Sequence, residues 1–222
     1  MSVRVLIADD HAVVREGLRM ILEAKGDMTI VGEALDGRDA IEKAEMLNPD
    51  VIIMDIAMPE MNGIEATRII CERFPAVKII ILSMHHTNEH IFRAIQAGAR
   101  AYLLKESAGA WVAKAIHTVM KGQYYFGAGV EAPPKVLRSN GRTHPASPIE
   151  SLSQREREVL QLVVEGKTSV EVAEILFLSP KSVETYRSRL MLKLGVNNIP
   201  SLVKFALLHG ITPADITPDD NN

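Results

Sequence analysis

The chain has 222 residues, enough for one large or two ordinary domains, and its 47% hydrophobic and 24% charged residues are typical of a globular protein. The net charge of −3 argues neither for nor against a nucleic-acid partner, and the single cysteine, Cys71, excludes an internal disulfide. No signal-peptide pattern opens the sequence and the apolar runs are shorter than the roughly 18 residues of a membrane span, so we expect a cytoplasmic protein without a membrane partner.

The first half of the sequence alternates short apolar runs with amphipathic segments. We expect strands at residues 3–8, 28–34, 51–55, 77–83 and 101–104, each followed by a helix. Five strand–helix units with short connections predict a doubly wound α/β fold. Its five-stranded parallel sheet should have the order 2-1-3-4-5, with helices on both faces.

The second half begins with a region rich in glycine and proline and continues as an all-helical segment. We expect four helices, at residues 154–165, 170–176, 180–194 and 199–208. The predicted organisation is a domain at 1–125, a linker at 126–147 with room for a short broken helix at 134–137, a four-helix domain at 148–211 and a flexible tail at 212–222.

The third predicted strand ends in a charged residue that a buried strand does not need. The stretch from residue 51 to 63 reads VIIMDIAMPEMNG, and its aspartate is Asp55. The residues after it predict a tight turn in which Gly63 would accept a positive φ. Helix capping would explain a lone aspartate here, but ligands of open α/β sheets bind at the carboxyl ends of the strands. Asp55 is therefore a candidate site residue.

Other polar residues follow neighbouring strands in the same way. Asp9 and Asp10 come after the first strand, Ser83 ends the fourth and Lys105 follows the fifth. In the predicted strand order these side chains converge, and three crowded carboxylates require a cation such as Mg²⁺. Lys105 would contact a phosphate oxygen and Ser83 would donate its hydroxyl. Asp55 would then be the nucleophile that accepts a phosphoryl group as an acyl phosphate.

These motifs carry a family resemblance. The acidic pair, the sequence MPEMNG after Asp55, Ser83 and the sequence AYLLK make residues 1 to about 121 resemble the receiver domain of bacterial two-component response regulators. The resemblance implies that Mg²⁺ is held by Asp10, Asp55 and the backbone carbonyl of Ala57, with Asp9 assisting through water. It also makes Ser83 and Tyr102 a switch pair, with ordinary packing at the sheet edge as the less favoured alternative for Tyr102.

Several histidines lie near this predicted site. His11 follows the acidic pair, and His85, His86 and His90 follow the fourth strand. A transition-metal site requires ligands at fixed geometry, and loop histidines are more often solvated, so we interpret these residues as solvated. His85 and Ala57 flank the predicted pocket and could affect the lifetime of a phosphoryl group there.

The helical segment resembles the helix-turn-helix domain of LuxR-type regulators (the NarL/FixJ class), from the sequence LSQREREVL to about residue 210. On the helix at 180–194 an inward face should be formed by Val183, Tyr186, Leu190 and Leu194. The opposite face should meet DNA. That face carries the candidates for base edges, namely Glu184, Thr185 and Ser188. The candidates for phosphate contacts are Lys181, Ser182, Arg187, Arg189 and Lys193.

The helical segment also has an alternative interpretation and some departures from the family pattern. An ordinary helical bundle with a solvated basic face would show similar spacing. The family often has Asn-Lys where this sequence has Ser169-Val170, and often His where it has Tyr186. Glu184 would repel phosphate but could accept a hydrogen bond from a cytosine amino group.

Together the two resemblances imply a transcription regulator switched when a sensor histidine kinase phosphorylates Asp55. Its partners would be the kinase, double-stranded DNA and a second copy of itself, paired on phosphorylation or on DNA. It would not be an enzyme beyond its own phosphoryl transfer and autodephosphorylation. The alternatives are phosphorylation-independent DNA binding, a protein-binding module, and a magnesium-dependent phosphatase with an aspartyl-phosphate intermediate. A phosphatase of this kind would need a second general acid near Asp55, and the residues that follow it, Ile56 and Ala57, supply none.

Overall fold

A computed structural model describes residues 2–85, 87–132 and 148–211. The chain divides into two compact units, Met1–Thr143 and His144–Asn222, which are considered separately. Most of the expected linker, the short helix considered at 134–137, the expected tail at 212–222 and His86 lie outside the described residues. Within the described ranges, no helix is both long enough and apolar enough to cross a membrane.

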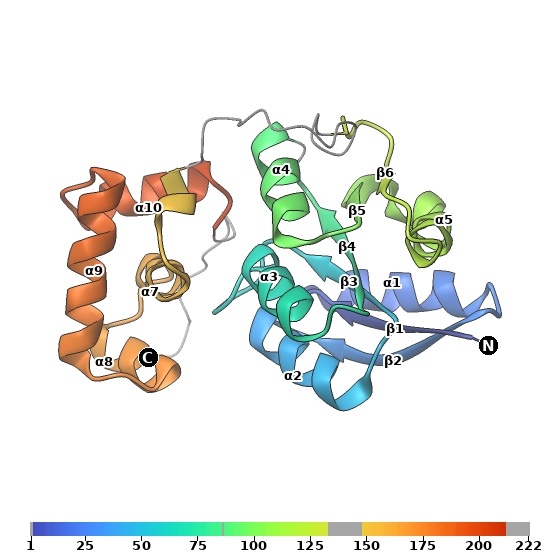
Figure 1. The fold of residues 1–222 in the computed structure, drawn as a ribbon, viewed down its shortest axis with the longest axis horizontal. Coiled ribbons are helices and arrows are strands. Elements are labelled where there is room, and N and C mark those ends of the chain that lie inside the picture. Colours follow the sequence, from blue (N-terminus) through green and yellow to red (C-terminus); the bar gives the residue numbers. More distant parts are fainter. Residues whose placement is uncertain (1, 86, 133–147, 212–222) are drawn as a thin grey trace. The chain divides into compact units, whose positions relative to one another are not determined.

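The first unit is a parallel sheet with helices on both faces (Figure 1). Its strands are β1 (Val3–Ala8), β2 (Met28–Ala34), β3 (Val51–Asp55), β4 (Lys78–Ser83), β5 (Ala101–Leu104) and β6 (Tyr125–Phe126). The helices are α1 (Ala12–Glu23), α2 (Gly37–Leu47), α3 (Gly63–Arg73), α4 (Asn88–Ala97) and α5 (Ala108–Met120), with a 3₁₀ turn at Lys105–Ser107.

The observed strand order is β2-β1-β3-β4-β5-β6, which confirms the predicted order and adds a sixth strand at one edge. Tyr125 N–H donates to Arg100 O at 3.0 Å and Gly127 N–H donates to Tyr102 O at 3.0 Å, so the chain after α5 pairs with β5. A strand of two residues is too short to show an alternating pattern, which is why the sequence did not indicate β6.

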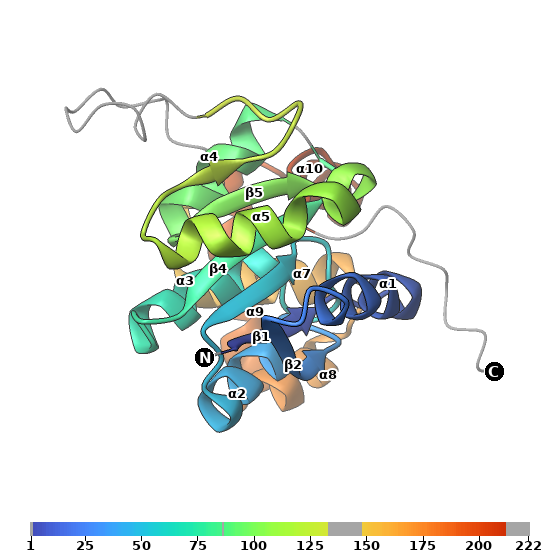
Figure 2. The ribbon, with the colours of Figure 1, turned by 90° about the vertical axis from the view of Figure 1, so that its right-hand side faces the viewer.

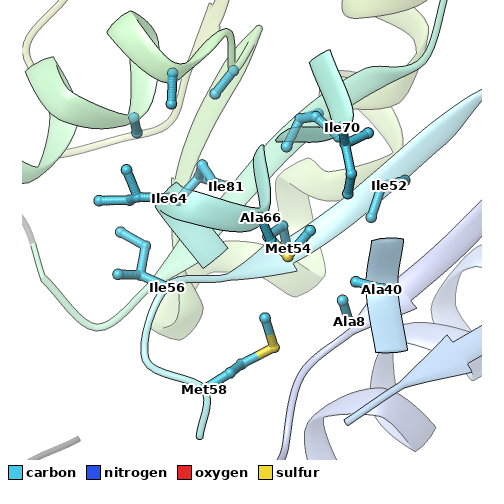
Figure 3. Close-up of a cluster of buried hydrophobic side chains, with 14 of the residues drawn as sticks. Ala8, Ala40, Ile52, Met54, Ile56, Met58, Ile64, Ala66, Ile70 and Ile81 are labelled. Atoms are coloured by element: carbon cyan, nitrogen blue, oxygen red, sulfur yellow. The ribbon is translucent and has the colours of Figure 1, made fainter. Parts of the chain in front are cut away.

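Two apolar clusters enclose the sheet, because side chains along each strand point alternately to its two faces. One cluster joins the sheet to α2, α3 and α4, and Figure 3 shows part of it, with Met54 from β3 packed near Ile64 and Ile70 of α3. The other cluster joins the opposite face to α1 and α5, which lie on the same side of the sheet in Figure 2. Burial on both faces explains why the central strands are continuous apolar runs.

The turn after β3 differs from the expectation for Gly63. This glycine does not have a positive φ; Glu60 does, at 59°. Gly63 is required by close packing instead, since a Cβ atom there would lie 1.8 Å from the backbone oxygen of Asp55. Asn62 caps α3 by accepting from Glu65 N–H at 3.0 Å. The absence of a side chain at Gly63 therefore allows α3 to begin against the end of β3.

The second unit is helical. It contains a 3₁₀ turn at Pro148–Ser151 followed by α7 (Gln154–Val164), α8 (Ser169–Leu176), α9 (Pro180–Leu194) and α10 (Ile199–Leu208). Ser153 and Thr168 form capping boxes at the starts of α7 and α8, and Pro180 begins α9 behind the capping residue Ser179. These four helices confirm the predicted helical domain, and they enclose one apolar core.

Candidate functional site

The polar residues expected to converge do so at the carboxyl edge of the sheet. Asp55 ends β3, Ser83 ends β4, and Asp9 and Lys105 directly follow β1 and β5. The parallel pairing of β1, β3, β4 and β5 brings these strand ends together. Asp9 and Asp55 are only 1% and 2% exposed, so the charged groups lie within the fold rather than on its surface.

Lys105 bridges two of the carboxylates. Its Nζ atom lies 2.8 Å from Asp55 Oδ2 and 2.8 Å from Asp9 Oδ2. Lys105 is 50 positions from Asp55 and 96 from Asp9 in the chain. The hydrogen bond from Lys105 to Asp55 links β3 to the start of the turn after β5. A buried cation shared between two buried carboxylates compensates much of their mutual repulsion.

Burial also changes the acidity of the site. It raises the pKa of Asp55 to about 6, because the charged carboxylate loses solvation; Asp9 and Asp10 add to this rise, and Lys105 opposes it. For Lys105 burial favours the neutral amine, but Asp55 and Asp9 outweigh it and raise the pKa of the lysine. Lys105 is therefore charged at neutral pH, whereas the ionised carboxylate of Asp55 is destabilised by its burial.

The acidic pair and Asp55 form a cluster that could hold a cation. Ligand atoms of Asp9, Asp10, His11 and Asp55 all lie within 4.8 Å of one another. His11 Nδ1 is 2.8 Å from Asp10 Oδ1 and 3.1 Å from Asp9 Oδ1, while its side chain remains 62% exposed, in keeping with the interpretation of this residue as solvated. The same interpretation is wrong for His90, which is only 3% exposed. A donor set dominated by carboxylate oxygens suits a hard ion such as Mg²⁺.

The hydrogen bonds that close the turn after β3 converge on Ile56, the residue before Ala57. The carbonyl of Ile56 accepts from Met58 N–H at 3.1 Å and from Gly63 N–H at 2.9 Å. The carbonyl that closes the turn is thus that of Ile56 and not that of Ala57, which follows it.

The predicted switch residues both contact the backbone of His85. Ser83 Oγ accepts from His85 N–H at 3.0 Å, and Tyr102 Oη donates to the His85 carbonyl at 2.7 Å. Tyr102 is fully buried, and burial raises the pKa of its phenol to about 12. The sequence did not indicate His85 as the link, because its backbone rather than its side chain makes these bonds.

In the second unit, α8 and α9 are joined by a turn at residues 177–179. Val183 and Leu190 are buried in the helical core, as expected from their spacing. The remaining α9 candidates are at least partly exposed: Lys181, Ser182, Glu184, Thr185, Arg187, Ser188, Arg189 and Lys193. They form one polar surface on α9, which is called the α9 face below.

Several side chains of the α9 face make contacts within the unit. Lys193 Nζ lies 2.7 Å from Glu156 Oε2 of α7, and Glu184 accepts a hydrogen bond from Ser169 Oγ of α8. The hydroxyls of Thr185 and Ser188 donate to the backbone one turn earlier, at 3.0 and 2.9 Å. The sequence did not indicate the pairings of Lys193 and Glu184, which join different helices.

Comparison with known proteins agrees with both halves of this description. Residues 5–117 match the response regulator receiver domain, and residues 150–206 match the bacterial regulatory proteins of the luxR family. The chain is 40% identical over 209 residues to the oxygen regulatory protein NreC of Staphylococcus aureus, covering 92% of this chain and 96% of that protein.

Two solved structures resemble the whole chain. The RcsB response regulator of Salmonella typhimurium, described for its conformational dynamism in DNA interaction, matches with a TM-score of 0.63 and 29% identity, over 94% of this chain and 98% of that one. A complex of the two-component response regulator RcsB with DNA matches with a TM-score of 0.56 and 29% identity, over 94% and 99%.

Proposed function

The chain belongs to the response regulators that combine a receiver domain with a LuxR-type DNA-binding domain, and we propose that phosphorylation of Asp55 by a sensor histidine kinase controls its binding to double-stranded DNA. The observation that carries this proposal is the buried carboxylate of Asp55, held by Lys105 beside Asp9 and Asp10 at the carboxyl edge of the sheet. The domains proposed are 1–125 for the receiver and 148–211 for DNA binding, joined by a linker at 126–147 whose first residue, Phe126, still belongs to β6.

Phosphoryl transfer to Asp55 requires little more than positioning and charge neutralisation. One carboxylate oxygen attacks the phosphorus of the phosphohistidine; the new P–O bond forms as the P–N bond breaks, and the histidine nitrogen leaves with the bonding pair. Lys105 already donates a hydrogen bond to Asp55, and its flexible side chain can turn to contact an oxygen of the phosphoryl group. Asp10, Asp55 and the Ala57 carbonyl would hold Mg²⁺, with Asp9 acting through water, and the ion would neutralise charge on the phosphoryl oxygens.

The switch would act through Ser83 and Tyr102. Ser83 Oγ now accepts from His85 N–H, but its own hydroxyl hydrogen can be donated to a phosphoryl oxygen on Asp55. Because Tyr102 is bonded to the carbonyl of the same His85, movement of Ser83 would be transmitted to β5. Repacking of this region would change domain docking or dimerisation and so the presentation of the α9 face to DNA.

The remaining parts of the proposal follow from this one. The chain acts as a homodimer on DNA, its chemistry is limited to its own phosphorylation and autodephosphorylation, and it works in the cytoplasm. Two RcsB proteins that resemble it are described in complex with DNA, one of them as two dimers on two parallel DNAs, which supports both DNA and a second copy as partners.

The proposal is tested by DNA binding with and without beryllofluoride, a phosphoryl analogue. DNA selected from a random library by the full chain would be titrated by fluorescence anisotropy at fixed salt. We expect beryllofluoride with Mg²⁺ to tighten binding about 10-fold, within the usual range of allosteric coupling. Asp55→Asn should bind DNA without responding. Wild-type binding that does not respond to beryllofluoride would support phosphorylation-independent binding. A response that persists in Asp55→Asn would place the acceptor at another residue, and absence of salt-dependent DNA binding would support the protein-binding module.

A further inference from the structure

Glu184 is the only acidic residue of α9, whose basic residues number four: Lys181, Arg187, Arg189 and Lys193. Its side chain is 56% exposed on the α9 face, where a carboxylate would be repelled by the phosphates of a DNA backbone. An exposed acid in such a place either weakens binding or has a defined acceptor role. Its contacts within the unit decide between these possibilities.

The carboxylate of Glu184 is held by a residue of the preceding helix. Ser169, the first residue of α8, donates its Oγ hydrogen to Glu184 Oε1. The backbone around Ser169 is fixed in turn, since Thr168 N–H donates to Glu171 Oε2 at 2.7 Å and Glu171 N–H donates to Thr168 Oγ1 at 3.3 Å. The hydroxyl that holds Glu184 thus projects from a capped helix start rather than from a loose loop.

The arrangement leaves one oxygen of Glu184 available. The hydrogen bond from Ser169 and the contact with Arg187 Nη1 at 3.8 Å both involve Oε1, and within the described part of the chain neither engages Oε2. A carboxylate with one oxygen held presents the other in a limited range of directions. The rotamer entropy lost on forming a further hydrogen bond is correspondingly smaller.

We propose that Ser169 is a positioning residue that orients Glu184 to accept a hydrogen bond from the exocyclic amino group of a cytosine in the major groove. The two residues together would set a preference for a C·G base pair at one position of each half-site. This inference rests on the proposed DNA-binding function and adds a determinant of sequence specificity to it.

The chemistry of the base edges selects cytosine. In the major groove guanine presents two acceptors and thymine presents an acceptor beside a methyl group, so both disfavour a carboxylate. Adenine presents a donor next to an acceptor, whereas cytosine presents its amino donor alone. Tethering Glu184 to Ser169 also limits how far its charge can swing toward the phosphates.

The test uses the full chain with beryllofluoride and the DNA selected by the wild type. Anisotropy titrations would compare the four base pairs at each position of one half-site for the wild type and the variants. Glu184→Ala removes the acceptor and should abolish a preference for cytosine of about 10-fold at one position, the scale of one good base contact. Glu174→Gln removes the same charge from an exposed site on α8 and should leave that preference intact.

Ser169→Ala should reduce the same preference to about 3-fold, because the loss of positioning weakens but does not remove the acceptor. Ser169→Thr keeps the hydroxyl and should retain the wild-type profile. Binding to non-specific duplex should be unchanged in both variants, which a general folding defect would not allow. A wild-type profile in Ser169→Ala, or no cytosine preference lost in Glu184→Ala, would overturn the inference. Lack of salt-dependent duplex binding by the wild type would overturn the proposed function itself.

Discussion

Lys105 Nζ lies 2.8 Å from Asp55 Oδ2, although the two residues are 50 positions apart in the chain. The contact places a buried ammonium group on the carboxylate proposed to accept phosphate. The two further carboxylates of Asp9 and Asp10 give the site more negative than positive charge. The pocket is therefore poised for a divalent cation and a phosphoryl group, and its energetics can be tested without any kinase.

Asp55→Asn should make the metal-free protein more stable at pH 8. The folded pKa of Asp55, about 6, lies above its ordinary value of 3.8, so stability falls as pH rises from 3.8 to 6 and the deficit persists above it. This pKa shift corresponds to roughly 3 kcal/mol of stability at most. We expect Asp55→Asn to raise the free energy of unfolding by about 1–3 kcal/mol. Urea unfolding in EDTA would measure the free energy of unfolding.

The same comparison at pH 4 is the control, because the wild-type carboxyl is then protonated and the gain should largely vanish. At pH 8, saturating Mg²⁺ should stabilise the wild type more than Asp55→Asn, since the variant lacks one carboxylate of the cluster. An equal gain at both pH values would refute the assignment of the raised pKa to Asp55.

Tyr102→Phe should lower the stability of the receiver domain by about 1 kcal/mol, the usual value of one intramolecular hydrogen bond. The change removes the hydroxyl that donates to His85 O at 2.7 Å and retains the buried ring. Thermal and urea unfolding would measure the loss. A variant as stable as the wild type would mean that the bond to His85 contributes nothing. Magnesium affinity, which depends on Asp9, Asp10 and Asp55, should not change.

Lys193→Ala and Lys181→Ala should separate stability from DNA affinity. Lys193 pairs with the buried Glu156, so its removal should cost the helical domain about 1–2 kcal/mol. Burial alone would raise the pKa of Glu156, but Lys193 and Ser153 lower it overall. This stabilisation is present above pH 4.5 and is lost on acidification, so the cost of Lys193→Ala should shrink at low pH.

Lys181 is exposed at the start of α9 and serves as the matched control. Lys181→Ala should leave the free energy of unfolding unchanged and reduce the slope of log affinity against log salt by about 1, as expected for a lost phosphate contact. The reverse pattern, with Lys181 affecting stability and Lys193 affecting only the salt slope, would contradict the roles assigned to these lysines.

Phe177→Asn should stabilise the helical domain. Phe177 caps the C-terminus of α8 in the left-handed conformation, with φ of 54°, and the residue is 92% exposed. A non-glycine residue in this conformation is strained by about 1–2 kcal/mol, and asparagine tolerates it better than other side chains do. We expect a gain of about 1 kcal/mol in urea unfolding. Phe177→Ala, which removes the ring without this tolerance, should have little effect; an equal gain there would assign the effect to the ring instead.

The sequence was most informative where a polar or charged residue directly follows or ends an apolar run. Buried apolar runs that end in Asp55, Ser83 or Lys105 predicted both the sheet and the convergence of these residues. Gly63 was correctly predicted to belong to the turn, but the predicted reason for a glycine there, a positive φ, was wrong. Only the folded backbone shows that its Cβ position coincides with the carbonyl of Asp55.

Pairings between polar side chains of different helices could not be read in the same way. Ser169 and Glu184 are 15 residues apart, and Lys193 and Glu156 are 37 apart. Neither pair leaves a periodic pattern, because such contacts depend on how two helices cross. The short strand β6 and the backbone bonds of His85 escaped prediction for a related reason, since they are made by main-chain groups that every residue has.

The central claim is that Asp55 accepts the phosphoryl group, and locating that group tests it most directly. The full chain would be incubated with acetyl phosphate and Mg²⁺ and then reduced with borohydride, which converts an aspartyl phosphate into homoserine that tandem mass spectrometry can place. We predict homoserine at position 55 in the wild type, dependent on Mg²⁺, and none in Asp55→Asn. Homoserine at another aspartate, or an unmodified Asp55 under conditions that phosphorylate the chain elsewhere, would contradict the account.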